Sequence, residues 1–337
     1  MKKILLCLCL VFILVKDVHA INFVGKSYIV IDAISGTILE AQNEEYVQSV
    51  ASISKIMTAI VAIENGKLSD EYTIGEEVNK AWGSGVYIHI GDKITLQDLL
   101  YGLLLRSGND AALCIAKNIS GDIKTFVKKM NQKAQELKLT HTHFSNPTGL
   151  DEEDKGNQSC ALDMALLMKY CSQNPIFNEI ASTKEYKRLD GNGTWHNKNK
   201  LLKEYDYCVG GKTGFTKKAK RTLVTRAVKD DLSLIIVTFN CGNDFEFHQK
   251  KYEECFEKYK NNLILPRGIY TYQGHSFLID KDIYSIELKD KEVSFIYKNN
   301  QIQVSYNHQI INSYKEEKFI DIIYRYWKIL LGEFVNG

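Results

Sequence analysis

The sequence predicts an α+β fold in which strands from both ends of the chain share one sheet and the helices lie between them. Two runs rich in β-branched residues, SYIVID at 27–32 and TILEA at 37–41, flank a turn and read as a hairpin. Helical periodicity then dominates to about Asn178, and strand-like runs return near Lys212. A sheet at both ends with helices inserted between its strands implies that the two ends meet.

The first twenty residues, MKKILLCLCLVFILVKDVHA, combine a basic start, an apolar run from Ile4 to Val15 and a small residue at the end. This order is typical of a secretory signal peptide. The alternative is a retained membrane anchor, but the apolar run is shorter than the roughly 20 residues that span a bilayer. We therefore expect residues 1–20 to be cleaved and the remaining chain to be exported.

The composition is that of an ordinary globular protein, with 45% hydrophobic and 25% charged residues. Without residues 1–20 the chain carries 40 basic and 40 acidic residues, so nothing in its charge favours nucleic acid as a partner. No pair of its cysteines has C-x-x-C spacing. Export permits disulfides, but buried free thiols are the expected state of Cys114, Cys160, Cys171, Cys208, Cys241 and Cys255.

Several helices are expected before the sheet resumes. Apolar residues recur at helical spacing over 51–65, with serines suited to capping at the start and Gly66 as a stop. Two apolar segments, 96–105 and 110–119, are separated by Arg106-Ser107-Gly108-Asn109, which predicts a tight connection. A further helix is expected over 123–137.

The second half predicts two strands, a helix and a separate small sheet. The runs 222–228 and 232–240 read as strands joined by a charged turn, and 244–261 reads as a helix. Pro266-Arg267-Gly268 marks a plausible boundary, and alternating runs beyond it suggest an antiparallel sheet. We therefore expect a main domain at 21–265, a small β-rich domain at 266–315 and a tail at 316–337.

The tail predicts an amphipathic helix over 319–334. One stripe carries Phe319, Ile323, Tyr326, Trp327, Leu330 and Phe334, and basic residues lie elsewhere. An aromatic and aliphatic stripe with basic neighbours fits a helix that lies in the headgroup region of a membrane. The same stripe fits docking on the protein's own core, and the sequence leaves both alternatives open.

Three short motifs occur in order along the chain. Ser52-Ile53-Ser54-Lys55 is the only S-x-x-K, Ser107-Gly108-Asn109 is an S-x-N, and Lys212-Thr213-Gly214 is the only K-T-G. S-x-N also occurs at 172–174 and 305–307, so this triplet alone is weak. The three motifs together are typical of penicillin-binding proteins and class A β-lactamases.

Each motif has a chemical task. Ser52 and Lys55 lie three apart on one helix face, and a lysine surrounded by apolar residues loses basicity and can take the proton of a nucleophilic serine. Ser107 can pass a proton to the leaving amine, and the Asn109 amide can bond the peptide backbone of a substrate. Lys212 and Thr213 offer a charge and a hydroxyl to a substrate carboxylate. Gly214 lets the substrate lie along the strand as an added edge.

Longer stretches carry a more specific resemblance. ASISKIMTAIVAIENG, GDKITLQDLLYGLLLRSGNDAA, HFSNPTGLDEE and VGGKTGFTKKAKRTLVT, with the signal peptide, small β domain and amphipathic tail, resemble the serine-type D-alanyl-D-alanine carboxypeptidases, the low-molecular-mass penicillin-binding proteins. The likeness covers nearly the whole chain. It implies a β-lactamase/transpeptidase-like domain and no cofactor or metal.

The resemblance also assigns roles. It implies Ser52 as the acylated nucleophile, Lys55 as its base, and the backbone N–H groups of Ser52 and Phe215 as an oxyanion hole. The implied substrate is a peptidoglycan stem peptide that ends in D-Ala-D-Ala, and β-lactams would acylate the same serine. In the family the tail attaches the enzyme to the outer face of the cytoplasmic membrane.

Two departures and three alternatives accompany this interpretation. Thr148 stands where the family often has His, and Gly210-Gly211 precedes Lys212 where an acidic residue is usual, which leaves substrate preference open.

A β-lactamase would need a second base, and Glu152 and Glu153 lack the surrounding pattern expected of one. Endopeptidase activity on the same fold is also open. A metal site from His141 and His143 would need further ligands that the sequence does not place.

Overall fold

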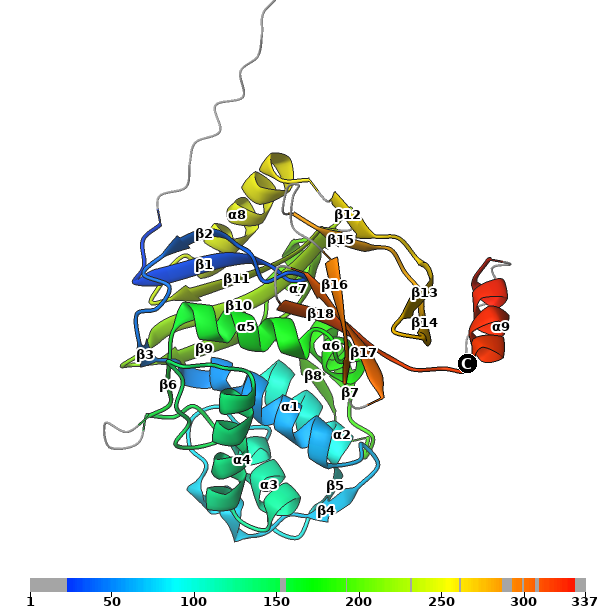
Figure 1. Cartoon of the computed structure of the whole chain (residues 1–337). Helices are drawn as coiled ribbons and strands as arrows, with labels where there is room; N and C mark the ends of the chain where they lie inside the picture. Colours follow the sequence, from blue (N-terminus) through cyan, green and yellow to red (C-terminus); the bar gives the residue numbers. More distant parts are fainter. Residues whose placement is uncertain are drawn as a thin grey trace, which may run out of the picture.

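The structure is a computed structural model that describes residues 23–151, 156–191, 193–230, 232–260, 262–286, 293–298, 300–306 and 309–330. Two parts are visible in Figure 1, a larger body of sheet and helices and a smaller C-terminal part of strands and one helix. The predicted signal peptide at 1–20, together with Glu152, Glu153 and the end of the tail, lies outside the described residues.

A five-stranded antiparallel sheet forms the centre of the larger body. Its spatial order is β2-β1-β11-β10-β9, so the N-terminal hairpin joins the three later strands through the pairing of β1 with β11. This confirms the expected meeting of the two ends of the body. The strands are β1 (Ser27–Asp32), β2 (Ile38–Gln42), β9 (Cys208–Thr216), β10 (Lys220–Lys229) and β11 (Leu232–Phe239).

The central strand β11 is apolar except for Ser233 and Thr238, because both faces of the sheet are covered. All eight of its residues are buried. Ile235 and Val237 face the helical region, whereas Leu234 and Ile236 face helix α8 (Asp244–Lys258) on the other side. Successive side chains of a strand point to opposite faces, so a strand between two layers reads as a continuous apolar run.

The helical region lies on one side of this sheet (Figure 1). At its centre α1 (Lys55–Asn65) buries its first eight residues. The other helical elements on this side are η1 (Ala51–Ser54), η2 (Glu76–Lys80), α2 (Leu96–Tyr101), η3 (Gly102–Arg106), α3 (Asn109–Ser120), α4 (Ile123–Glu136), α5 (Ala161–Cys171) and α6 (Pro175–Ser182), whereas α7 (Leu201–Glu204) packs into the core on the α8 side. Three short antiparallel pairs join them: β3 (Gln48–Ser49) with β6 (Gln158–Ser159), β4 (Glu71–Thr73) with β5 (Lys93–Thr95), and β7 (Glu185–Lys187) with β8 (Thr194–His196).

The helix expected from residue 51 begins later than predicted. Residues 51–54 form a 3-10 turn, and the α-helix starts at Lys55. Neither Val50 nor Ser54 caps its element with a side chain; the Ser54 hydroxyl instead donates to the Ala51 carbonyl at 2.8 Å. The prediction of a serine cap was wrong because Ser54 closes the turn onto itself.

The C-terminal part has its own small core. Leu265, Phe277, Ile279, Ile302 and Val304 are buried together. The strands are β12 (Asn262–Leu265), β13 (Gly268–Tyr272), β14 (His275–Ile279), β15 (Ile283–Ser285), β16 (Val293–Lys298), β17 (Gln301–Tyr306) and β18 (Gln309–Lys315). Strand β12 pairs with β15, and Leu265 joins this core. The domain boundary at Pro266 stays a prediction.

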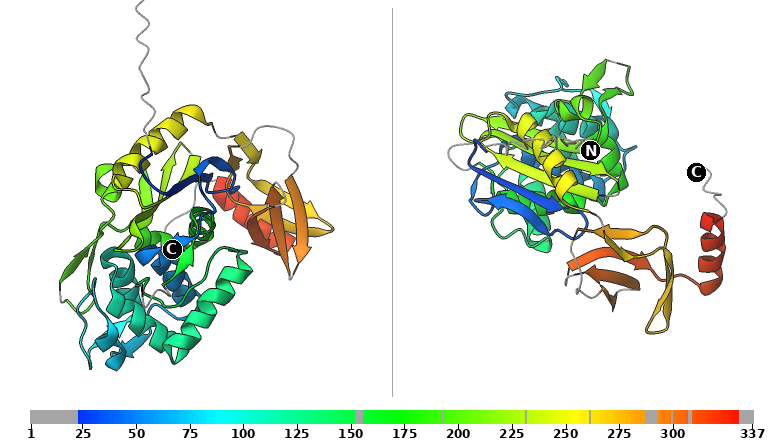
Figure 2. Two further views of the ribbon diagram at one scale, coloured as in Figure 1. Left: turned by 90° about the vertical axis from the view of Figure 1, so that its left-hand side faces the viewer. Right: turned by 90° about the horizontal axis from the view of Figure 1, so that it is seen from above.

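Helix α9 (Phe319–Leu330) follows, contacting β13 and β14 on the side away from the larger body (Figure 2). Ile322 is fully buried, whereas Phe319, Ile320, Tyr324 and Trp327 are 57–71% exposed. The helix therefore docks through one face and presents another aromatic face to solvent. Among the described residues, no helix combines the length and apolar character needed to cross a membrane.

The six cysteines after residue 20 are free and buried. Burial raises the pKa of the Cys160 thiol to about 12 and that of Cys241 to about 11. The prediction of buried free thiols is confirmed.

Candidate active site

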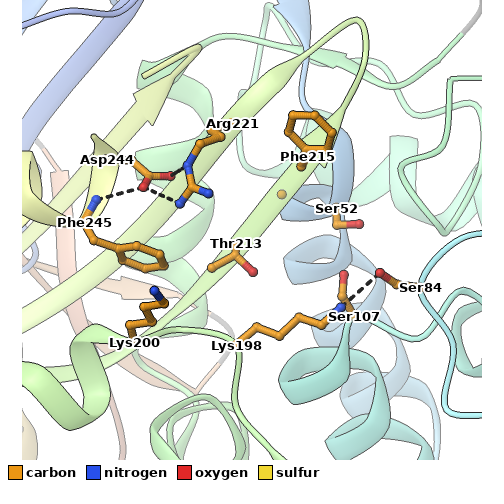
Figure 3. Close-up of a pocket in the computed structure, with 11 residues that line it drawn as sticks. Ser52, Ser84, Ser107, Lys198, Lys200, Thr213, Phe215, Arg221, Asp244 and Phe245 are labelled. Carbon is orange, nitrogen blue, oxygen red and sulfur yellow. Dashed lines mark hydrogen bonds and ion pairs between the residues drawn. The ribbon is translucent and has the colours of Figure 1, made fainter. Parts of the chain in front are cut away.

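A pocket of about 330 Å³ opens between strand β9 and the helical region (Figure 3). Ser52 and Ser107 line its helical side, and Thr213, Gly214 and Phe215 line its sheet side. All three motifs of the sequence therefore meet in one place. Because β9 is the edge strand of the sheet, its outer side is open to an extended peptide.

Close packing of β9 against the turn of Ser52 requires the glycine of the K-T-G motif. A Cβ at Gly214 would lie 2.3 Å from the Thr222 Oγ1 atom and 3.0 Å from the Ser52 nitrogen. Thr222 in turn donates to the Val50 carbonyl at 3.0 Å, which ties the next strand to the same turn. Gly214 thus sets the distance between Ser52 and β9, a role that the sequence alone did not indicate.

A second glycine, Gly149, packs against the turn that carries Ser52. Gly149 has a φ of +81°, and a Cβ there would lie 2.1 Å from the Ala51 carbonyl oxygen. The loop before it is held by the buried Asn146, whose Oδ1 accepts from the backbone of Thr148 at 3.1 Å and of Gly149 at 2.8 Å. The backbone on both sides of Ser52 is therefore fixed by close contacts.

Lys55 is fully buried, and its Nζ lies 3.1 Å from the Ser52 Oγ. It also donates to the Asn109 Oδ1 at 2.7 Å and to the Thr148 carbonyl. Burial, helped by the charge of Lys198, lowers the pKa of Lys55 to about 7, against a smaller opposing effect of Asp110. At neutral pH a substantial fraction of Lys55 is therefore a neutral amine that can accept the Ser52 proton.

Thr148, one of the two departures from the family pattern, acts here through its main chain. Its carbonyl contacts Lys55, and its side chain bonds the Asn146 Oδ1 at 2.8 Å. A backbone carbonyl is present whatever the side chain, so this contact with Lys55 does not depend on the departure.

Asn109 is buried next to Lys55. It is 2% exposed, its Oδ1 accepts from Lys55, and its Nδ2 donates to the Trp82 carbonyl at 2.5 Å. The amide therefore connects Lys55 to the loop of Trp82 and does not line the pocket. Its role as a substrate-binding group stays a prediction.

Like Asn109, Lys212 is buried and does not line the pocket. Its Nζ donates to the Ser107 Oγ at 3.1 Å and to the Thr213 carbonyl at 2.7 Å. Burial, and then the charges of Lys55 and Lys198, lower its pKa well below the usual range. Ser107 has a φ of +63° at the end of η3, and this left-handed turn points its hydroxyl between Lys212 and the pocket. Lys212 is thus positioned to orient Ser107, and its role towards a substrate carboxylate stays a prediction.

The structure adds a cationic side that the sequence analysis missed. Lys198, Lys200 and Arg221 line the pocket, and Arg221 is held by two bonds to Asp244, at 2.6 and 3.1 Å. Arg221 pairs with Phe215 in the antiparallel register of β10 and β9. A prediction of a hairpin directly after K-T-G would therefore have placed Arg221 next to the site. No local pattern marks Lys198 or Lys200.

One group of potential metal ligands lies elsewhere. Among the described residues, donor atoms of His141, Cys160 and Asp163 lie within 4.8 Å of one another, and His143 is not part of the group. These residues already serve the start of α5: the Asp163 N–H donates to the Cys160 Sγ at 3.4 Å, and the His141 N–H donates to the Asp163 Oδ2 at 2.8 Å. The group is accounted for by helix capping.

Comparison with known proteins agrees with the three motifs. The profile of the peptidase S11 family, described as D-alanyl-D-alanine carboxypeptidase, matches residues 15–243. The chain belongs to this family. It is 34% identical over 255 residues to the D-alanyl-D-alanine carboxypeptidase DacF of Bacillus subtilis, covering 72% of this chain and 65% of that protein. For DacC of Escherichia coli the values are 32% identity, 68% and 60%.

Solved structures confirm the fold class predicted from the sequence. The D-alanyl-D-alanine carboxypeptidase of Mycobacterium tuberculosis superposes with a TM-score of 0.67 at 28% identity, over 71% of this chain and 94% of that one. A D-alanyl-D-alanine carboxypeptidase DacD of Francisella tularensis gives a TM-score of 0.68 over 88% of this chain and 95% of that one. At 22% identity the second comparison shows the fold alone.

Proposed function

We propose that this protein is a serine D-alanyl-D-alanine carboxypeptidase that removes the terminal D-alanine from peptidoglycan stem pentapeptides through an acyl-enzyme on Ser52. The observation that carries the proposal is the 3.1 Å contact between the Ser52 Oγ and the Nζ of a fully buried Lys55. A serine hydroxyl needs a base within hydrogen-bond reach, and burial keeps that base partly neutral.

In the acylation step, neutral Lys55 takes the Ser52 proton while the Oγ attacks the carbonyl carbon of the penultimate D-alanine. The negative charge that develops on the carbonyl oxygen is stabilised by the backbone N–H groups of Ser52 and Phe215. The C–N bond then breaks, and the leaving amine of the terminal D-alanine receives a proton through Ser107, which Lys212 orients. Water hydrolyses the resulting ester and restores the Ser52 hydroxyl.

The carboxylate of the leaving D-alanine is bound on the cationic side of the pocket. Thr213 offers its hydroxyl there, and Lys198, Lys200 and Arg221 supply positive charge against the single carboxylate of Asp244. A free carboxylate at the end of the substrate fits this excess of positive charge. Removal of a terminal residue is therefore favoured over cleavage within a longer chain, where no such carboxylate is present.

Location is proposed from the two ends of the chain. A signal peptide at 1–20 would export the enzyme to the peptidoglycan, and the exposed aromatic face of α9 would attach it to the outer surface of the cytoplasmic membrane. Phe319, Ile320, Tyr324 and Trp327 supply the apolar contact area. Lys318 and Lys328 add charges that attract anionic lipids, whereas Arg325 is paired with Glu317.

The proposal is tested by mass spectrometry of the purified protein with benzylpenicillin and by D-alanine release from a pentapeptide. The expected result is a stable adduct of wild type that Ser52→Ala lacks, with D-alanine release at least about 10³-fold slower in the variant. Rapid penicillin hydrolysis without an adduct would support a β-lactamase. Unchanged D-alanine release from Ser52→Ala would refute the proposal.

A further inference from the structure

A hollow of about 380 Å³ lies between the larger body and the C-terminal part. Its wall on the larger body includes Arg226 of β10 and Ser233 of β11, and its other wall includes Asp280, which follows β14, and Tyr314 of β18. None of its described lining residues lines the active-site pocket. Along β10, Arg226 is about 16 Å of strand length from Arg221, so the hollow is a separate place in the molecule.

Arg226 supplies the positive charge on the wall of the larger body. Its side chain is partly buried, with Nε donating to the Ser233 Oγ at 3.0 Å and Nη1 to the Asn178 Oδ1 at 3.3 Å. Both acceptors are neutral, and no carboxylate of a described residue forms an ion pair with Arg226. Burial lowers its pKa, against a smaller opposing effect of Tyr252. A guanidinium has five N–H groups and stays charged at neutral pH, so three of them remain for a ligand.

The opposite wall carries an acidic group that is also unpaired. The Asp280 carboxylate forms no ion pair or hydrogen bond with another described residue. Burial, followed by the charge of Asp280, raises the pKa of Tyr314 to about 12, so this carboxylate lies near the Tyr314 hydroxyl. The neighbouring Asp282 instead accepts from the Arg267 N–H at 2.6 Å and holds its own turn. Lys281, which is exposed, is the remaining charged residue of this wall.

The charges of the hollow fit a ligand that carries both signs. Among the described residues that line it, two cationic side chains balance two carboxylates, whereas the active-site pocket has an excess of positive charge. A planar guanidinium with free N–H groups binds a carboxylate through two parallel hydrogen bonds, and a carboxylate attracts an ammonium group. A balanced pair of unpaired charges on facing walls therefore favours a small zwitterion over a simple anion.

We propose that the hollow between the two parts binds a free α-amino acid, with its carboxylate on Arg226 and its ammonium group on Asp280. This site goes beyond the proposed function and takes from it only the choice of probe, because D-alanine is the amino acid that the proposed reaction releases. Since the two walls belong to different parts of the molecule, a bound amino acid connects β10 to the turn after β14.

The inference is tested by ligand-detected NMR titration of the purified protein with D-alanine, after acylation of Ser52 by benzylpenicillin to fill the active-site pocket. The expected Kd is on the order of 1 mM. N-acetyl-D-alanine lacks the ammonium group and D-alaninamide lacks the carboxylate, so each should bind at least about 5-fold more weakly. Arg226→Gln and Asp280→Asn should each raise the Kd of D-alanine about 10-fold, a loss in the range of one charged hydrogen bond.

Arg267→Gln is the matched control, because Arg267 is an exposed arginine of the C-terminal part that does not line the hollow. It should keep the wild-type Kd. Asp280 is exposed, so Asp280→Asn tests the site even if Arg226→Gln disturbs the sheet. The absence of D-alanine binding, equal binding of the three ligands, or an unchanged Kd in Asp280→Asn would overturn the inference.

The two proposals fail separately. If benzylpenicillin forms no adduct, the proposed function is in error, and the hollow is then measured in Arg221→Gln, which removes one cation of the active-site pocket. D-alanine binding that persists in Arg221→Gln and weakens in Arg226→Gln supports the site between the two parts. Binding that is lost in Arg221→Gln and unchanged in Arg226→Gln would place D-alanine in the active-site pocket and overturn the inference.

Discussion

Lys55 and the surface of α9 are opposite in their exposure to water: a polar group is buried at the first, and apolar groups are exposed at the second. Lys55 is a charged residue type held in a fully buried position by three acceptors, whereas α9 holds four large apolar side chains 57–71% exposed to water. Both arrangements are costly by ordinary folding energetics. The comparison shows that the packing of the larger body removes Lys55 from water, whereas the C-terminal part leaves an aromatic face of α9 exposed to it.

The largest effect is expected from Lys55→Met, which keeps the length of the side chain and removes the base. D-alanine release should fall at least about 10³-fold, because the Ser52 proton has no acceptor. The folded state should persist, since a buried amine is replaced by an apolar group of similar size. Steady-state kinetics and urea unfolding measure both properties. Lys67→Met, at an exposed lysine, is the control and should be neutral; an active Lys55→Met would contradict the role of the base.

Gly214→Ala is expected to have the next largest effect. The added Cβ meets the Thr222 Oγ1 and the Ser52 backbone, so β9 and the nucleophile must move apart. We expect about 10²-fold lower kcat/KM and a loss of about 1–3 kcal/mol in the free energy of unfolding. Gly242→Ala is the matched control, because a Cβ there has no neighbour within 4 Å among the described residues. Equal kinetics for the two variants would show that the close approach is unimportant.

The pH dependence of the wild-type enzyme should report the environment of Lys55. The neutral amine is the reactive form, so kcat/KM should rise with pH and reach half its plateau at a pH of about 7. In Lys198→Gln a nearby positive charge is lost, the pKa of Lys55 rises, and the half-maximal pH should move upward. A shift to lower pH, or none, would contradict this electrostatic coupling. The measurement is kcat/KM from pH 5 to 9.

The smallest effect on chemistry is expected in the C-terminal part. Ile320→Asp/Trp327→Asp places charges on the exposed face of α9 and should weaken binding to anionic lipid vesicles at least several-fold. Release of D-alanine from a soluble peptide should stay within about twofold of wild type. Vesicle flotation measures the binding, and Ile296→Asp, at an exposed position of β16, is the control. Vesicle binding that is unaffected by the double variant would contradict the proposed attachment.

The sequence by itself determined the features that depend on neighbours along the chain. Apolar runs and turns predicted strands of the central sheet, and the spacing of Ser52 and Lys55 predicted two reactive groups within reach of each other, which the structure places 3.1 Å apart. The order of the three motifs then indicated a shared site. Boundaries were less well predicted, as at the 3-10 turn before Lys55, because contacts from the loop of Gly149 shape that turn.

Only the tertiary structure decided how the site is assembled. Asn109 is 54 residues from Lys55 and Thr148 is 93 residues away, yet both bond its Nζ. Lys212 turned out to contact Ser107, and Lys198 and Arg221 joined the pocket without a motif of their own. These contacts join residues far apart in the chain, and local spacing carries no information about which distant side chains the packing of sheet and helices brings together.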